Sequence, residues 1–209
     1  MATLPERAGS RAMAIDSLLG QVDRLILSPG SAGDQAKFAG CVDAPDVFLG
    51  VDDDLIYPPD YVERILLGLN EFPDAIVSFH GWVADSEGEH VENYRCMEFL
   101  GGPADVDVVG TGVCAFRVST IRPRTDDFRL PNQADLWLAL RAEREGIRRV
   151  VLPHPARWLG YTEWPHTIWH DTAYDMGGPL DAGESKRCAL YELLPLLNER
   201  HDREKPSED

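Results

Sequence analysis

Residues 47–54 read VFLGVDDD, a short apolar run that ends in three consecutive carboxylates, Asp52, Asp53 and Asp54. The run holds β-forming residues, so it predicts a buried strand over residues 47–51. Side chains alternate across a strand, which would place Asp52 and Asp54 on one face and turn Asp53 away. Ligands of open α/β sheets bind at the carboxyl ends of strands. Two carboxylates there suit Mg²⁺ or Mn²⁺, which in turn hold phosphates, so the stretch predicts a metal–phosphate site.

Two other interpretations of the acid triplet compete with the metal site. Acidic runs are common in solvated loops, but ionised carboxylates beside an apolar strand are costly unless they are paired or bind a metal. A calcium-binding loop needs acids at alternate positions, followed by a Gly and a late Glu. Ile56 and Tyr57 stand where its third ligand and its Gly would be, so the calcium loop is excluded.

Length and composition predict one globular domain with an acidic surface. The chain has 209 residues, of which 44% are hydrophobic and 27% are charged, and this is enough for a full core. Its net charge of −16 disfavours a broad attraction to nucleic acid or to anionic membranes. Seven arginines between residues 122 and 149 would allow a local basic groove. A solvated helix face balanced by salt bridges is the favoured interpretation of them.

The four cysteines are scattered along the chain and form no C-x-x-C pair, which predicts reduced structural thiols. No apolar stretch approaches the length of a membrane span, and the N-terminus lacks the apolar region of a signal peptide. We therefore expect a protein of the cytoplasm without an integral membrane segment.

Strand and helix signals alternate along the chain, which is the pattern of an α/β fold. Apolar runs bounded by turn residues predict strands over residues 24–27, 47–51, 75–79, parts of 106–118, and 149–152. Apolar residues at helical spacing predict helices over residues 6–19, 58–69, 132–145 and 184–200. Turn residues predict a loop over residues 28–34, and residues 84–93 show no clear period. The charged tail, residues 201–209, is expected to be disordered.

Five short motifs follow one another in an order that resembles a known family. They are Gly33-Asp34 with Lys37-Phe38, VDDDLIYPPDY at 51–61, SFHG at 78–81, GTG at 110–112 and ADLW at 134–137. This order is similar to that of glycosyltransferases of the GT-A fold, close to the large family 2 group and to a bacterial and phage subgroup with the same acid motif. The resemblance covers residues 1 to about 171. It implies a Rossmann-like, mostly parallel sheet flanked by helices in one domain over residues 1–200, in a bacterial or phage-infected cell.

The resemblance implies a hexosyltransferase that moves a sugar from a nucleotide-diphospho-sugar, in the first instance a UDP-sugar, to an acceptor hydroxyl. A divalent ion, Mn²⁺ or Mg²⁺, would neutralise the charge that builds on the leaving diphosphate. Asp54 is the expected direct metal ligand. Asp52 is expected nearer the ribose or the water shell of the metal. Asp53 is also expected to contribute to binding of the donor. The acceptor stays open between a glycan, a lipid-linked glycan, a protein and a modified DNA base.

Two further motifs resemble the donor-binding parts of the family. Asp34 and Lys37 look like the loop pair that contacts the base or ribose and the phosphates, with a solvated side chain as the alternative for the lysine. Gly110, Thr111 and Gly112 would bring the backbone close to the donor sugar or the acceptor. A plain strand break or bulge is the alternative for this turn.

Asp135 is the expected general base, because the family carries an acid at the start of the helix that follows the acceptor-side strand. It would take the proton of the acceptor hydroxyl while the anomeric carbon is attacked from the opposite face, which gives an inverting single displacement. An acid in the first turn also complements the helix dipole, and this is the structural alternative for Asp135.

Histidines and tryptophans of the C-terminal half offer further candidates. One of His154, His166 and His170 is expected to complete the metal shell, with His166 and His170 preferred. His80 follows a strand and would line the donor pocket or serve the structure. Three tryptophans, Trp158, Trp164 and Trp169, suit a sugar-stacking surface or the core.

The N-terminus departs from the family pattern, because only Met1 precedes the segment Ala2-Thr3-Leu4-Pro5-Glu6-Arg7. The family has a full strand there, and the nucleotide pocket leans on its end. Thr3 and Arg7 are the expected remaining contributors to that pocket.

Two other classes of function compete with the transferase. A phosphohydrolase of the haloacid type also places a D-x-D at a strand end, and it would use Asp52 as its nucleophile. Such motifs usually lie near the chain start, with Thr or Val after them, where this chain has Ile56. The third interpretation is a nucleotide-sugar-binding module without turnover.

Overall fold

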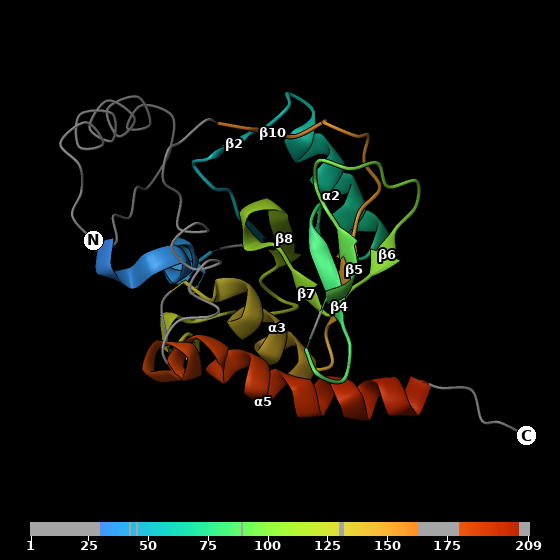
Figure 1. Cartoon of the computed structure of the whole chain (residues 1–209). Coiled ribbons are helices and arrows are strands. Elements are labelled where there is room, and N and C mark those ends of the chain that lie inside the picture. The colour runs from blue at the N-terminus through green and yellow to red at the C-terminus, as the bar shows by residue number, and fades with distance from the viewer. Residues whose placement is uncertain are drawn as a thin grey trace, which may run out of the picture.

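The computed structural model describes residues 30–41, 43–44, 46–88, 90–129, 132–162 and 180–204 (Figure 1). The expected helix at 6–19 and strand at 24–27 lie outside these residues. The described part mixes helices and strands, as the sequence predicts.

A five-stranded sheet forms the centre, with the order β1 (Val47–Leu49), β8 (Cys114–Arg117), β3 (Ala75–Ser78), β9 (Arg148–Val151), β6 (Ala104–Asp105). The pair β3–β9 is parallel, and the pairs β1–β8, β3–β8 and β6–β9 are antiparallel. The prediction of a mostly parallel sheet is therefore wrong for the described strands. The reason is that β8 enters the sheet directly from a tight turn and runs back between β1 and β3. Consequently β1, β3 and β9 all run in one direction, opposite to β8.

Two small sheets flank the central one. One pairs β2 (Leu55–Ile56) with β10 (Gly160–Tyr161), and the other has the order β5 (His90–Tyr94), β4 (Gly81–Ala84), β7 (Val108–Val109). The hairpin of β4 and β5 occupies the segment in which the sequence shows no period. It escapes prediction because β5 is an edge strand of polar residues, and even its Val91 is 57% exposed.

Three α-helices and three 3₁₀ helices complete the described chain. The α-helices are α2 (Tyr61–Glu71), α3 (Ala134–Arg144) and α5 (Leu180–Glu204). The 3₁₀ helices are η1 (Gly30–Gly40), η2 (Thr111–Val113) and η3 (Thr125–Asp127). The helices expected near 58–69 and 132–145 are confirmed as α2 and α3. Much of η1 was not predicted. Its first residues are typical of turns and predicted a loop, and its apolar residues do not gather clearly on one helical face.

Helices cover both faces of the central sheet (Figure 1). On one face, α3 and α5 pack with η1 against Ile76 and Phe116. On the other face, α2 packs against Val77 and Ala115, the next residues along the same two strands. Alternation of side chains across β3 and β8 thus divides the core into two layers. The first layer contains four stacked phenylalanine rings, from Phe38, Phe48, Phe116 and Phe128.

The buried stripe of α2 differs from the one its apolar residues suggest. Tyr61, Ile65, Gly68 and Leu69 face the core, whereas Val62 is 50% exposed. Gly68 belongs to the buried stripe because a Cβ there would overlap the side chain of the core residue Leu152. A small residue therefore sets how closely α2 approaches the sheet.

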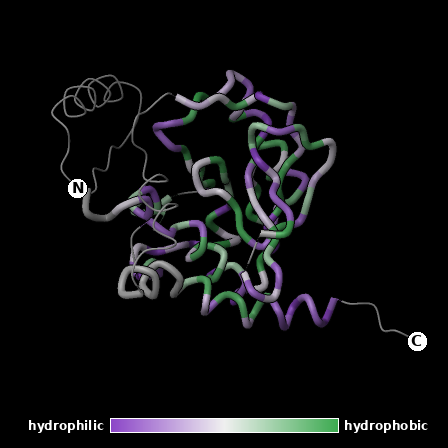
Figure 2. Tube along the Cα trace, viewed as in Figure 1, coloured by the Kyte–Doolittle hydropathy of each residue, from purple (hydrophilic) through white to green (hydrophobic). Residues whose placement is uncertain are grey.

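The C-terminal helix α5 is fixed to the domain by apolar packing and by buried charges. It runs beneath α3 in Figure 1, and Figure 2 shows it hydrophobic there and hydrophilic towards its C-terminal end. Arg200 forms ion pairs with Asp107 and Glu143, two acids that are almost fully buried. His201 Nε2 lies 3.3 Å from Asp107 Oδ1. These contacts explain why the helix continues to Glu204, past the expected end at residue 200, through part of the tail predicted to be disordered.

Two predictions about membranes and thiols can be compared with the structure. No helix among the described residues is long and apolar enough to cross a membrane. Cys41, Cys96 and Cys114 are buried and free, which confirms reduced thiols for these three. Burial raises the pKa of the Cys41 thiol to about 12, so this group is not a reactive thiolate.

Candidate functional site

The candidate site lies at the sheet edge where β1 ends and β8 begins. Two backbone hydrogen bonds join the segments there: the Gly50 N–H donates to the Cys114 carbonyl at 2.8 Å, and the Phe79 N–H donates to the Val113 carbonyl at 3.2 Å. Because β1 and β3 run in the same direction, their carboxyl ends meet at this edge. The acids after β1, residues 52–54, are thereby placed beside the η2 turn that precedes β8.

Two glycines allow the acid loop and the η2 turn to approach each other. A Cβ on Gly50 would overlap the carbonyl oxygen of Thr111. A Cβ on Gly112 would overlap Asp52 Oδ2. The Asp52 carboxylate therefore rests directly on the backbone of the glycine turn. The sequence analysis expects the backbone at Gly112 to lie close to the donor sugar or the acceptor, and that stays a prediction; in the described structure Asp52 lies there.

Lys37 reaches the same place from η1. Its ammonium forms an ion pair with Asp52 Oδ1 and lies 3.4 Å from Thr111 Oγ1. The kink that directs η1 here occurs at Gly33, whose φ of 64° favours glycine. The Lys37 side chain is 17% exposed, so the interpretation as a solvated lysine is wrong. Burial lowers the pKa of the Lys37 ammonium, but the charge and hydrogen bond of Asp52, together with the charge of Asp135, raise that pKa overall.

Asp135 holds the η2 turn from the first turn of α3. Its Oδ1 accepts a hydrogen bond from the Thr111 N–H at 2.9 Å and another from the Thr111 hydroxyl at 2.5 Å. Because Thr111 also approaches Lys37, the three residues form a continuous polar chain to Asp52. The predicted base is thus joined to the predicted acid site through one threonine.

Asp34 links η1 to the start of α3. Its Oδ2 accepts a hydrogen bond from the Ala134 N–H at 2.9 Å, in place of the missing side-chain cap on that helix. Its Oδ1 is buried and has no hydrogen-bond partner in the described structure. Burial and the neighbouring Asp135 charge raise the pKa of Asp34, although the Ala134 N–H opposes the shift. This carboxylate therefore has one buried oxygen whose hydrogen-bonding capacity is unused in the described structure.

The acids themselves lie in a turn and not on the strand. β1 ends at Leu49, and Val51 is 51% exposed, so the predicted strand is two residues too long and strand alternation does not position the carboxylates. Asp53 is exposed, whereas Asp52 and Asp54 are half-buried. Burial, followed by the charges of Asp52 and Asp53, raises the pKa of Asp54. A cation beside Asp54 would relieve this crowding of negative charge.

A divalent ion would find two protein carboxylates here and would need further oxygen ligands. Among the described residues, no group of three or more His, Cys, Asp or Glu side chains is arranged to hold a metal. Mg²⁺ and similar hard ions are commonly bound by one or two carboxylates, waters and the phosphates of a substrate. The pair Asp52 and Asp54 fits that mode of binding, with oxygen chemistry suited to Mg²⁺ or Mn²⁺.

Several predicted residues lie elsewhere. Thr3, Arg7, His166 and His170 lie outside the described residues, as do Trp164 and Trp169. His154 is 2% exposed, and its ring nitrogens lie 2.8 Å from the Leu152 carbonyl and 3.2 Å from the Arg95 carbonyl. Both nitrogens are engaged, so His154 is a structural residue and not a metal ligand.

Two other predicted side chains lie close to the core near the site. The His80 ring packs over Gly110, where a Cβ would meet it at 2.9 Å. Trp158 packs against Phe79 and donates a hydrogen bond to Asp60 Oδ1 at 3.0 Å. The interpretation of Trp158 as a core residue therefore holds for the described structure.

Tyr57 is a residue of the site that the sequence analysis missed. Its hydroxyl accepts a hydrogen bond from the Asp52 N–H at 2.7 Å and donates one to the Gly112 carbonyl at 2.6 Å. Burial raises the pKa of Tyr57, which keeps this donor protonated. The hydroxyl joins the acid loop to the glycine turn. The available signal in the sequence was its position three residues after Asp54, within the acid motif.

Replacing Tyr57 by Phe is expected to loosen this junction. The change leaves the buried Asp52 N–H and Gly112 carbonyl without their shared partner, which costs about 1–3 kcal/mol of unfolding free energy. Urea unfolding followed by circular dichroism measures the loss. The matched control is Tyr191→Phe, at an exposed position on α5. Equal stability of the two variants would contradict the role of the Tyr57 hydroxyl.

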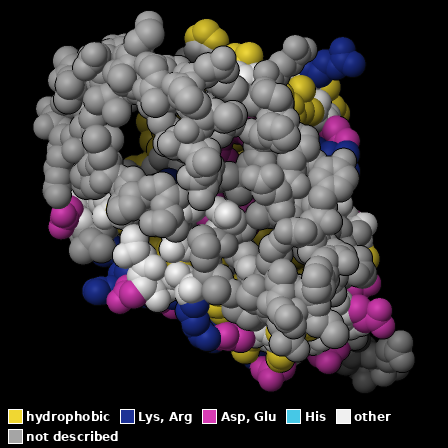
Figure 3. Space-filling model, turned by 60° about the vertical axis from the view of Figure 1, so that its left-hand side comes forward, with side chains coloured by type: hydrophobic (Ala, Val, Ile, Leu, Met, Phe, Trp, Pro, Cys, Tyr) yellow, Lys and Arg dark blue, Asp and Glu magenta, His cyan; other side chains and the backbone are white. Residues whose placement is uncertain are grey.

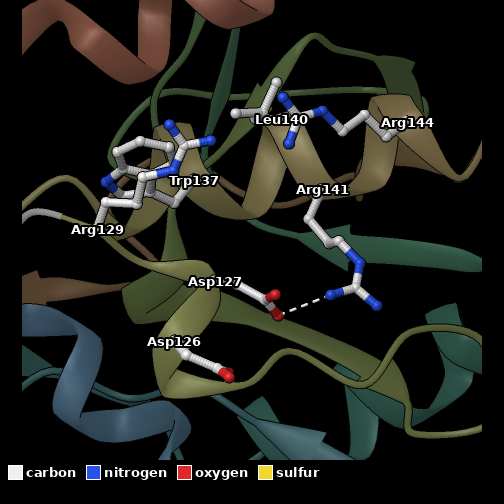
Figure 4. Close-up of a pocket in the computed structure, with 7 residues that line it drawn as sticks. All are labelled: Asp126, Asp127, Arg129, Trp137, Leu140, Arg141 and Arg144. Atoms are coloured by element: carbon white, nitrogen blue, oxygen red, sulfur yellow. Dashed lines mark hydrogen bonds and ion pairs between the residues drawn. The ribbon is translucent and has the colours of Figure 1, made fainter.

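A cavity of about 160 Å³ lies beside α3 and η3, and Figure 4 shows the residues that line it. Its lining includes Trp137, Arg129, Arg141 and Arg144. The guanidinium of Arg129 lies 5.2 Å from the Trp137 ring centre. Each arginine is paired with a carboxylate: Arg141 contacts an aspartate of η3, and the other two contact a glutamate of α5. The cavity does not overlap the residues of the candidate site.

Ion pairs balance most of the arginines between residues 122 and 149. Besides the three at the cavity, Arg124 pairs with Asp126, Arg148 with Asp105, and Arg149 with Glu143. Figure 3 shows Lys or Arg side chains beside Asp or Glu side chains along the lower rim of the face in view. The prediction that salt bridges balance these arginines is confirmed for these six.

No family model matches the chain, and no curated protein matches it either.

Proposed function

We propose that this chain is a metal-dependent glycosyltransferase that moves a sugar from a nucleotide-diphospho-sugar, a UDP-sugar in the first instance, to an acceptor hydroxyl. The observation that carries the proposal is the convergence of four separate motifs. Lys37, Asp52, Thr111 and Asp135 come from four stretches of sequence and form one connected polar chain at a sheet edge. A stability role alone does not require acids and a lysine from all four motifs to meet there.

We also propose that the strands of the central sheet have a GT-A arrangement. In a GT-A arrangement, the strand that carries the acid motif would run parallel to the other nucleotide-facing strands. β1, β3 and β9 run in one direction, and the acids follow the carboxyl end of β1. This direction supports the proposal, because ligands of open α/β sheets bind outside the carboxyl ends of strands.

Asp52 and Asp54 would hold the divalent ion, which supplies positive charge to the leaving diphosphate when bound. The protein's own contribution is to position the two carboxylates. Tyr57 and Gly112 fix the backbone around Asp52, and the Thr162 N–H donates to the Asp54 carbonyl at 2.9 Å. Both acids are therefore held in position through backbone contacts.

Asp34 and Lys37 would hold the rest of the donor. The buried Oδ1 of Asp34 has no partner in the described structure, and a ribose hydroxyl is a donor that would satisfy it. The Lys37 ammonium is a compact point charge on a flexible stem and suits a phosphate oxygen. The two residues are three positions apart on η1, so one element presents both groups.

Asp135 would act as the general base on the acceptor hydroxyl. Thr111 donates both of its hydrogen bonds to Oδ1 of Asp135, and no hydrogen bond to Oδ2 occurs among the described residues. Oδ2 would take the proton of the acceptor hydroxyl as the oxygen attacks the anomeric carbon. The Thr111 bonds orient the carboxylate for this step, which gives an inverting displacement.

The phosphohydrolase interpretation fits the same acids less well. A nucleophilic Asp52 would need an accessible oxygen to attack phosphorus. Its Oδ2 rests against Gly112 and its Oδ1 is paired with Lys37. Phosphatase activity of the purified protein on simple phosphate esters, lost on Asp52→Asn, would reverse this preference.

The test is the thermal stability of the protein with UDP, GDP, CDP or ADP, each with and without Mn²⁺. A ligand at a hundred times its Kd adds about 2.7 kcal/mol to the unfolding free energy. For a domain of this size, that raises the Tm by roughly 5–10 °C. We expect a shift with one nucleotide, and we expect it to require Mn²⁺.

Two variants make this test specific. Asp54→Ala is expected to abolish the Mn²⁺-dependent shift, because it removes the proposed direct ligand. The matched control, Asp74→Ala, removes an exposed carboxylate before β3, at the opposite end of that strand from the site. A full Mn²⁺-dependent Tm shift in Asp54→Ala, or no Tm shift of the wild type with any nucleotide, would contradict the proposed donor site.

A further inference from the structure

Lys37 takes the position at Asp52 that a cation bound to this carboxylate would need. The Asp52 carboxylate has one oxygen, Oδ2, against the backbone of Gly112, where even a Cβ would not fit. The other oxygen, Oδ1, contacts the Lys37 ammonium. A divalent ion that binds Oδ1 would therefore arrive next to an existing positive charge, and the two would repel each other.

We propose that Lys37 is an internal counter-ion of the acid site, which weakens the binding of a divalent ion alone and moves to the diphosphate when donor and ion bind together. The inference rests on the proposed function, because it assigns the regulation of that same site. The ammonium and the metal would be alternative partners of Asp52. Only when the diphosphate is bound would the Lys37 ammonium and the divalent ion both remain in the site, because the diphosphate supplies negative charge to both.

The charges around Lys37 support this role. Asp52 and Asp135 both act on the Lys37 ammonium, and Lys37 in turn acts on Asp34 and Asp54. Four carboxylates therefore share one lysine. Without a ligand, the lysine offsets part of their mutual repulsion, which is a reason for a largely buried ammonium at this place.

The Lys37 ammonium lies between two polar partners. Its ammonium lies 3.4 Å from Thr111 Oγ1, beyond its contact with Asp52, so it stands between the acid loop and the η2 turn. A lysine stem is flexible, and a small rotation would carry the ammonium from a carboxylate oxygen to a phosphate oxygen. Ion and nucleotide would then bind with positive coupling, which is equal in both directions by thermodynamic linkage.

The test is a titration of Mn²⁺ by isothermal calorimetry, alone and with saturating UDP, on the wild type and on Lys37→Met. We expect Lys37→Met to bind Mn²⁺ alone about tenfold more tightly than the wild type, within the range of couplings between sites. We expect UDP to tighten Mn²⁺ binding in the wild type by a similar factor and to do so less in the variant. Equal or weaker binding of Mn²⁺ alone by Lys37→Met would overturn the proposal.

Three further variants separate the explanations. Arg203→Met removes one exposed positive charge on the last turn of α5, and it should leave Mn²⁺ affinity unchanged. Lys37→Arg keeps the charge and should bind Mn²⁺ alone as weakly as the wild type does. Lys37→Gln keeps a polar head and should match Lys37→Met, and it replaces that variant if Met does not fold.

The outcomes also distinguish the inference from the proposed function. Mn²⁺ binding that is lost in Asp54→Ala but equal in the wild type and Lys37→Met keeps the metal site and overturns the counter-ion. A wild type that binds no Mn²⁺, with or without UDP, overturns the metal site and the counter-ion together.

Discussion

Asp135→Asn is expected to retain metal-dependent nucleotide binding and to lose sugar transfer by about 10²–10⁴-fold, the range that a general base contributes. The substitution is close to isosteric. An amide oxygen accepts the two Thr111 hydrogen bonds as the carboxylate Oδ1 does, so the η2 turn stays in place. The substitution removes one negative charge and, with it, the ability to take a proton. Single-turnover transfer from the donor chosen by the thermal test measures the loss.

The matched control for Asp135 is an acid at the start of another helix. Glu63 lies in the first turn of α2, so Glu63→Gln removes the same charge near a helix N-terminus, away from the site. Its transfer rate should equal that of the wild type. If Asp135→Asn also transferred sugar at the normal rate, Asp135 would be a helix-dipole and turn-anchoring residue only.

Gly112→Ala is expected to disrupt the site through a single methyl group. An added Cβ would overlap Asp52 Oδ2, and the Asp52 carboxylate has no room on the other side because Lys37 contacts it. Overpacking of this kind costs about 1–3 kcal/mol of unfolding free energy. We expect a lower Tm and no Mn²⁺-dependent shift with nucleotide, since Asp52 must leave its place.

Gly102→Ala is the matched control, because a Cβ at that position would meet nothing within 4 Å. It should keep both the Tm and the nucleotide-dependent shift. A Gly112→Ala protein that behaves like the control would mean that Asp52 does not rest on the glycine turn. Loss of the nucleotide shift with an unchanged Tm would locate the effect in ligand binding and not in folding.

The helices α2 and α3 could be predicted from local sequence signals. The helix after Pro58 and Pro59 forms as α2, and the helix before Gly146 forms as α3. Gly146 has a φ of 67°, the backbone that a glycine at a helix end adopts. Each of these elements depends on residues within a few positions of one another. Their presence could therefore be predicted from spacing and capping residues alone.

Elements that depend on distant partners were predicted poorly. The β4–β5 hairpin has few apolar residues because β5 lies at a sheet edge. The direction of β8 could not be predicted, because the apolar sequence of a buried strand does not show whether its neighbours are parallel or antiparallel. The buried face of α2 shifted to Gly68 because the side chain of Leu152, far along the sequence, packs there.

For the candidate site, the sequence by itself determined the residue types and their order: the acid triplet, the lysine of η1, the glycine turn and the acid at the start of α3. Tertiary structure alone decided which atoms meet, namely Lys37 with Asp52 and Thr111 with Asp135. It also revealed the contribution of Tyr57. The physical reason is range: propensity and spacing act over a few residues. Ion pairs and hydrogen bonds between motifs up to about a hundred positions apart exist only once the sheet has brought the motifs together.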